Sequence, residues 1–445
     1  MMRNRSKKSD LIFAWIYLVV GYLWVYVFSS WNFSRNIAWF TVLYVVVVLV
    51  YMEAGEKQAQ KTENKDHMRE RVFWTVVTLA IGISYAFWTV MPLLQTMVLM
   101  MTAAYWTLCV SGRLLQSHRT SEWVACDVWN ALIIVPFSNF TCQFRILFGK
   151  ETEKTETEKE RETAKSEDRV KQSNFSGVIC GIVIAIPLLC IILPLLSSAD
   201  EGFQMMFSNL GQFVTEHFGV FLLRLVFAIP VSMYLFGLAY GGKTGRGTQS
   251  MQPDHMRKSM AEMRVLPDIA VAVAGGIICF VYVVFILLQA KYFLSAFTGV
   301  LPESFTYAEY ARRGFFELCM IAALNLGILT ASGAFAKTER KNNRGLRILN
   351  VALSVLTLLL LATAASKMAL YVSAYGLTVK RVLTLVFMIW LALVFAGIIA
   401  RQWKTFALIR SSVLAGTVMY TLLCVFPVEM WINTYNNMMG FGLLP

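Results

Sequence analysis

The sequence predicts an all-α fold, a polytopic transmembrane helical bundle of about eleven spans with the N-terminus in the cytoplasm and the C-terminus outside. Three observations support this prediction. The 445-residue chain is 57% hydrophobic and only 15% charged, with a mean hydropathy of +0.58, whereas about 25% charged residues is usual in soluble domains. Its apolar residues form continuous runs of roughly the 20 residues that a membrane-spanning helix needs. Its positive charges lie mostly in alternate loops.

Eleven apolar runs are long enough to be membrane spans. Each is expected to be helical, because hydrocarbon offers the backbone no other hydrogen-bond partner and the runs lack the alternating pattern of barrel strands. The predicted spans are residues 11–28, 36–52, 72–90, 92–111, 176–197, 218–240, 268–290, 314–335, 348–366, 382–400 and 408–427.

The distribution of lysine and arginine sets the predicted orientation. The loops on the N-terminal side of the membrane hold 32 of the 40 Lys and Arg residues. This asymmetry follows the positive-inside rule, so the N-terminus is expected in the cytoplasm and the C-terminus, after an odd number of spans, outside. Because the net charge of +13 has this topological explanation, we predict no nucleic-acid binding.

A charged linker divides the predicted spans into two groups. Residues 1–149 hold four spans and a segment, 122–140, in which Pro136 is expected to interrupt a helix. That segment is expected to lie along the membrane interface, and a helix packed under the bundle is the alternative. Residues 150–173 are almost entirely polar and are predicted to form a solvated cytoplasmic linker, either helical or disordered. Residues 174–445 hold the other seven spans.

A charged stretch, TYAEYARRGFFEL at 306–318, precedes the eighth span. Thr306 and Glu309 form a capping box, which predicts that a helix begins here. Glu309, Arg313 and Glu317 follow at intervals of four, so one helical face offers its own ion pairs. The predicted orientation places this face at the outer surface, where its charges partly neutralise one another.

Other polar residues are predicted at the same depth, including Lys291, Lys367 and Arg224. Lysine near a helix end commonly extends to the interface only as an anchor, which is the alternative for Lys367. An ionisable group inside a span normally faces a partner or a wet cavity, so both internal pairing and ligand contact remain open for Arg224 and Glu317. The candidate binding residues are Arg224, Lys291, Tyr307, Glu309, Tyr310, Arg312, Arg313, Glu317, Lys367 and Tyr375.

The sequence contains no recognisable catalytic or cofactor motif. Its four histidines show no HExxH spacing, and its eight cysteines form no CxxC pair, so we predict no metal site. GKTGRGTQS at 242–250 resembles a phosphate loop in composition but lacks the GxxxxGK[ST] spacing. We therefore predict no catalytic residue and no cofactor.

LPESFTYAEYARRGFFEL at 301–318 and LYVSAYGLTVKRVLTLVFMIWLALVF at 370–395 resemble the bacterial polytopic membrane proteins catalogued as domain of unknown function 4173. SSAD at 197–200 and WINTYN at 431–436 are weaker matches to the same pattern. The resemblance covers roughly residues 175–437. It implies a location in the bacterial cytoplasmic membrane, as a multi-pass protein, and a shared helical bundle, but no reaction.

Three functions fit these patterns. The first is a non-enzymatic membrane protein that binds a small anion, a peptide or a lipid headgroup at the outer polar cluster for sensing or transport, because arginines grip phosphate and carboxylate bidentately. The second is an enzyme acting on a lipid-linked substrate with Glu309 or Glu317 as general base. The third is a bundle in which the cluster only locks spans together. Membrane lipids are the expected partners in each case.

Overall fold

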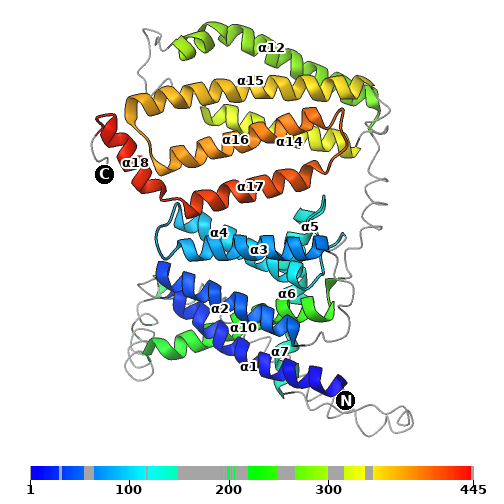
Figure 1. Cartoon of the computed structure of the whole chain (residues 1–445), viewed down its shortest axis with the longest axis vertical. Coiled ribbons are helices and arrows are strands. Elements are labelled where there is room, and N and C mark those ends of the chain that lie inside the picture. Colours follow the sequence, from blue (N-terminus) through cyan, green and yellow to red (C-terminus); the bar gives the residue numbers. More distant parts are fainter. Residues whose placement is uncertain are drawn as a thin grey trace. The chain divides into compact units, whose positions relative to one another are not determined.

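The computed structural model describes residues 2–29, 33–54, 65–116, 119–148, 219–248, 266–298, 315–335 and 344–441, with a few isolated positions between 192 and 205. In these ranges every long regular element is a helix, which confirms the predicted all-α fold (Figure 1). The helices are α1 (Met2–Phe28), α2 (Phe33–Glu53), α3 (Lys65–Ser84), α4 (Pro92–Val110), α5 (Val124–Trp129), the π-helical turn η1 (Asn130–Ile134), α6 (Val135–Ser138), α7 (Cys142–Phe148), α10 (Gly219–Thr244), α12 (Asp268–Thr298), α14 (Phe315–Phe335), α15 (Arg344–Tyr375), α16 (Val379–Ala400), α17 (Leu408–Val425) and α18 (Val428–Met438).

The described part of the chain includes nine helical segments that are long and apolar enough to cross a membrane, and the protein is a multi-pass membrane protein. They include counterparts of eight predicted spans. The predicted span 314–335 corresponds to α14, whose apolar part, Glu317–Gly333, is shorter. The predicted span 72–90 is partly covered by α3, and 176–197 lies almost wholly outside the described residues. The count of eleven spans and the orientation stay predictions.

The helices group into two compact units. Unit 1 comprises Met1–Phe87, Leu99–Leu114 and Ala125–Ser250, and unit 2 comprises Trp88–Val98, Leu115–Val124 and Met251–Pro445. The predicted linker, 150–173, lies outside the described residues. The predicted division of the chain at that linker therefore stays a prediction.

The most extensive helix pair in unit 1 is α1 with α10. Gly21 of α1 makes this close approach possible, because a Cβ atom there would lie 2.6 Å from the Cβ of Ser232 and 2.7 Å from the carbonyl oxygen of Ala228. Small residues at such crossings let membrane helices pack backbone to backbone. Polar bonds add to the same contact: Gln143 of α7 donates to the Ala14 carbonyl at 2.9 Å and accepts from the Ser232 hydroxyl at 3.1 Å.

The regular α-helix is interrupted around Pro136, as predicted. The α-helical pattern of α5 changes to the π-helical turn η1 just before the proline, and α6 ends two residues after it, at Ser138. Val124–Phe148 as a whole is nevertheless long and apolar enough to span a membrane. Proline removes the backbone donor to the carbonyl four residues earlier. Leu132 lies four residues before Pro136, and the Tyr234 hydroxyl of α10 donates to its carbonyl at 2.9 Å. A tertiary hydrogen bond therefore replaces the missing helical one.

Replacing Tyr234 with phenylalanine is expected to lower the free energy of unfolding by about 1 kcal/mol, because the Leu132 carbonyl loses its donor. Thermal unfolding in detergent or nanodiscs measures this change. Tyr240→Phe is the matched control, since that ring stacks on Phe236 and its hydroxyl makes no hydrogen bond among the described residues. Equal losses in the two variants would contradict the assignment.

In unit 2, α15 packs against α12, α14 and α16, and α16 packs against α17 (Figure 1). Leu353, Leu360 and Ala364 of α15 and Leu391 and Phe395 of α16 are buried in its apolar core. One polar chain crosses this core. Tyr282 of α12 donates to the Asn325 side chain at 2.8 Å, and Asn325, fully buried in α14, donates to Thr357 of α15 at 2.9 Å. Such bonds hold membrane helices together.

Candidate functional site

The predicted site residues that the structure describes in unit 2 lie where α14 begins and α15 ends. We call this end of the unit the polar rim and define it by Glu317, Lys367, Tyr371, Tyr375 and Arg381. Lys367, Tyr371 and Tyr375 follow at intervals of four on α15, so they share one helical face. The predicted orientation assigns this end of the unit to the outside.

Lys367 is the most deeply placed cation of the polar rim. Its residue is only 6% exposed, although it belongs to a membrane-spanning helix. A charged group in such a position requires an electrostatic or hydrogen-bonding partner. The carboxylate of Glu317, which is exposed on α14, interacts electrostatically with Lys367. The structure thus brings together two of the predicted site residues from different helices.

Arg381 closes the C-terminal end of α15. Its guanidinium donates to the backbone carbonyls of Tyr375, at 3.0 Å, and Gly376. The last carbonyls of a helix have no intrahelical donor and carry partial negative charge, so a cation is favourable there. The same guanidinium lies over the Tyr371 ring, with Cζ 4.1 Å from the ring centroid. Tyr371 in turn packs on Tyr375, with ring centroids 5.2 Å apart.

The turn after α15 is held by Asn436 of α18. The Leu377 backbone N–H donates to Asn436 Oδ1 at 2.7 Å, and Asn436 Nδ2 donates back to the Leu377 carbonyl at 3.0 Å. Gly376 has a φ of 70°, and a Cβ atom at this position would lie 2.7 Å from Asn436 Oδ1. Glycine is therefore required both by the backbone conformation and by the close approach of the asparagine. The AYGL and WINTYN segments meet at this turn.

Several predicted site residues are not placed with the polar rim. Tyr307, Glu309, Tyr310, Arg312 and Arg313 lie outside the described residues, as does the side chain of Lys291, whose backbone belongs to α12.

Arg224 belongs to unit 1. Its Cζ lies 4.9 Å from the centroid of the Tyr26 ring, and its buried Nε has no hydrogen-bond partner among the described residues. The ring supplies a cation–π contact inside the unit.

Sequence reasoning missed Asn436 and did not include Arg381 in the site. From the sequence alone, Arg381 is an ordinary interfacial cation. Its bonds to the end of α15 depend on the path of the turn at Gly376, which the sequence does not show. Asn436 stood within a quoted motif, but nothing in the motif indicated that its amide would bond to Leu377. Among the described residues, no three His, Cys, Asp or Glu side chains gather at positions that could hold a metal ion.

The comparisons with known proteins identify a family but no activity. The model of a domain of unknown function, DUF4153, matches residues 75–437. The resemblance to domain of unknown function 4173 was therefore wrong about the family, and the match begins well before residue 175. No curated protein and no solved structure matches the chain. Because the family model covers most of the sequence, the chain belongs to the DUF4153 family.

Proposed function

We propose that this protein is a non-enzymatic protein of the bacterial cytoplasmic membrane that binds a small anion, a peptide or a lipid headgroup at the polar rim, for sensing or transport. The observation that supports it is the position of Lys367. The residue is only 6% exposed within a span, and the exposed carboxylate of Glu317 interacts with it electrostatically. A phosphate or carboxylate reaching this end of the helix would find a desolvated cation, where charge-assisted hydrogen bonds are strong.

The charge balance of this end of unit 2 also favours an anionic ligand. Lys367, Lys380 and Arg381 stand against two described carboxylates, Glu317 and Glu429. The Arg381 guanidinium already bonds to backbone carbonyls. We assign Lys380, which is exposed at the start of α16, and Lys367 to the ligand.

The remaining predicted residues are proposed to complete the site. Tyr307, Glu309, Tyr310, Arg312 and Arg313 immediately precede α14, and Lys291 lies near the end of α12. Two of them are arginines, which suit bidentate recognition of phosphate or carboxylate. Arg224 is a separate proposed contact, made from unit 1.

The test is anion-dependent thermal stabilisation of the purified protein in phosphatidylcholine nanodiscs. Inorganic phosphate, a dicarboxylate and added phosphatidylglycerol serve as probes. Lys367→Gln is expected to weaken the effective anion by about tenfold, because a charge-assisted hydrogen bond is lost.

Two further variants distinguish the loss of the positive charge at residue 367 from a defect in folding. Lys367→Arg keeps a cation at the rim and is expected to retain stabilisation. Lys404→Gln removes an exposed cation from the connection between α16 and α17 and is expected to behave as the unmodified protein. Identical anion responses in Lys367→Gln and Lys404→Gln would overturn the proposal.

A further inference from the structure

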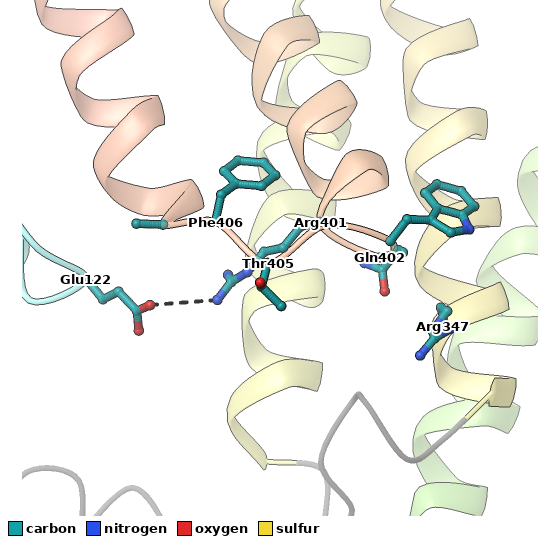
Figure 2. A pocket seen from close by; sticks show the side chains of 8 residues that line it. Glu122, Arg347, Arg401, Gln402, Thr405 and Phe406 are labelled. Carbon is teal, nitrogen blue, oxygen red and sulfur yellow. Dashed lines mark ion pairs between the residues drawn. The ribbon is translucent and has the colours of Figure 1, made fainter.

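A cavity of about 610 Å³ lies at the opposite end of α15 and α16 from the polar rim (Figure 2). Residues 401–403 and 405–407, from the connection between α16 and α17, form much of its wall, together with Arg347 from the first turn of α15 and Glu122. All of these residues belong to unit 2. The volume falls in the range of small-molecule binding sites.

Two arginines, Arg347 and Arg401, line the cavity. The Arg401 Nη2 atom lies 3.8 Å from Glu122 Oε1 (Figure 2). This distance is beyond hydrogen-bond range, and the Glu122 side chain is 55% exposed. So loose a surface pair leaves the Arg401 donors able to bind a second anion. An arginine commonly binds phosphate through two parallel N–H···O bonds.

Gln402 supplies a hydrogen-bond acceptor, whereas the arginines supply donors. It is 7% exposed and lines the cavity, and its Nε2 donates to the Ile398 carbonyl at 3.0 Å. Its Oε1 is buried and has no hydrogen-bond partner among the described residues. Buried acceptors are normally satisfied by a protein group, a water or a ligand. A ligand that fits this cavity therefore needs a hydrogen-bond donor as well as an anionic group.

The position of the cavity relates it to the membrane. α16 and α17 are both long and apolar enough to span a bilayer, so their connection lies at the depth of the lipid headgroups. Trp403 in this connection is 69% exposed. Tryptophan at a span end is typical of the membrane–water interface. The group most abundant at that depth is a phospholipid headgroup.

We propose that this cavity binds the phosphoethanolamine headgroup of a membrane lipid. Arg401 binds its phosphate, and its ammonium donates to Gln402 Oε1. The carboxylate of Glu122, which also lines the cavity, favours a headgroup that carries a positive charge. A phosphate group alone, with no N–H or O–H donor, would leave the buried acceptor unsatisfied, and a glycerol headgroup would offer the Glu122 carboxylate no positive charge. A choline headgroup carries no N–H donor and is excluded for the same reason.

The experiment compares headgroups on the purified full-length protein. Binding of phosphatidylethanolamine, phosphatidylglycerol and phosphatidylcholine is measured by lipid titration with native mass spectrometry and thermal unfolding. We expect phosphatidylethanolamine to bind about tenfold or more tightly than phosphatidylcholine, since the ammonium makes charge-assisted hydrogen bonds that choline cannot make. This comparison needs no variant, so a folding defect cannot obscure it. Equal affinity for the three lipids would overturn the proposal.

Variants then assign the preference to the cavity. Gln402→Met replaces the acceptor with an apolar side chain of similar size and is expected to abolish the preference for ethanolamine over choline. Arg401→Gln is expected to weaken all phospholipids at this site by about tenfold. Lys404→Gln changes an exposed residue of the same connection that does not line the cavity, and it should leave the preference intact. A preference that survives Gln402→Met would place the lipid elsewhere and overturn the assignment.

A further titration with soluble compounds distinguishes a lipid headgroup from a free metabolite as the ligand. O-phosphoethanolamine is titrated against the protein in phosphatidylcholine nanodiscs, with phosphocholine as its control. Weaker binding of the soluble compound than of the lipid supports a lipid headgroup as the ligand. Tighter binding of the soluble compound would overturn the lipid source. These outcomes are independent of the polar rim, because Lys367→Gln changes neither the cavity nor its lining.

Discussion

Replacing Gly21 with leucine is expected to lower the free energy of unfolding by about 3 kcal/mol, since overpacking of a tight interface forces backbones and rotamers out of place. The nearest atoms to an added Cβ include the backbone nitrogen of Ser232 at 2.8 Å and the Ala228 carbonyl oxygen. Neither can rotate away as a flexible side-chain end would. The helices α1 and α10 must therefore separate, and the polar bonds from Gln143 to both helices weaken with them.

Thermal and denaturant unfolding in nanodiscs measure this loss. Gly276→Leu is the matched control, because a Cβ atom at Gly276 of α12 meets no atom within 4 Å. That substitution is expected to be neutral, as the site is exposed and suits lipid contact. Gly21→Ala should fall between the two leucine variants. Similar stability of Gly21→Leu and Gly276→Leu would disprove the close packing of α1 on α10.

Helix positions could be predicted from the sequence because a bilayer leaves the backbone of an apolar run no alternative. The predicted span 382–400 corresponds to α16 (Val379–Ala400), and 408–427 corresponds to α17 (Leu408–Val425). Helix pairing could not be predicted in the same way. Lipid is as apolar as leucine, so hydropathy does not show which face of a span meets another helix. Nothing local to Gly21 indicates that Ser232 lies against it.

Pro136 shows how far a local rule reaches at one element. Proline removes a backbone donor, but the rule does not indicate whether a group elsewhere in the chain supplies another. Tyr234, 102 residues from Leu132 in the sequence, supplies that donor. Because this bond depends on the packing of α10 against α6, it could only be recognised once the tertiary structure was known.

The candidate sites also contain residues that the sequence indicated and residues that it did not. Residue type and depth were enough to single out Glu317 and Lys367, since ionisable groups in apolar runs are costly anywhere. Arg347 and Arg401 were explained by the positive-inside rule, which accounts for their side of the membrane and does not indicate that both line one cavity. Gln402 had no sequence signal, because its significance is the lack of a partner for a buried oxygen.

Replacing Lys243 with methionine is expected to destabilise the protein by about 3–5 kcal/mol, because removal of one partner leaves a mostly buried charge without its counterion. Lys243 Nζ of α10 lies 3.0 Å from Asp10 Oδ1 of α1, and their side chains are only 10% and 14% exposed. The Tyr51 hydroxyl of α2 donates to the same Asp10 oxygen at 3.0 Å, and the Lys243 amine lies 4.1 Å from the centroid of the Tyr51 ring. Three helices therefore meet at this one ion pair.

A second substitution distinguishes a buried charge from a general loss of packing. Adding Asp10→Asn to Lys243→Met removes the stranded carboxylate and keeps an oxygen that accepts from Tyr51, so the double variant should be more stable than Lys243→Met alone. Lys8→Met, at an exposed position on the same helix as Asp10, is the control and should change stability by less than about 0.5 kcal/mol. Gly21 is about 16 Å along α1 from Asp10, far enough for its effect to add independently. If Asp10→Asn instead adds its own full loss to that of Lys243→Met, the two residues do not form the interaction that joins α1 to α10.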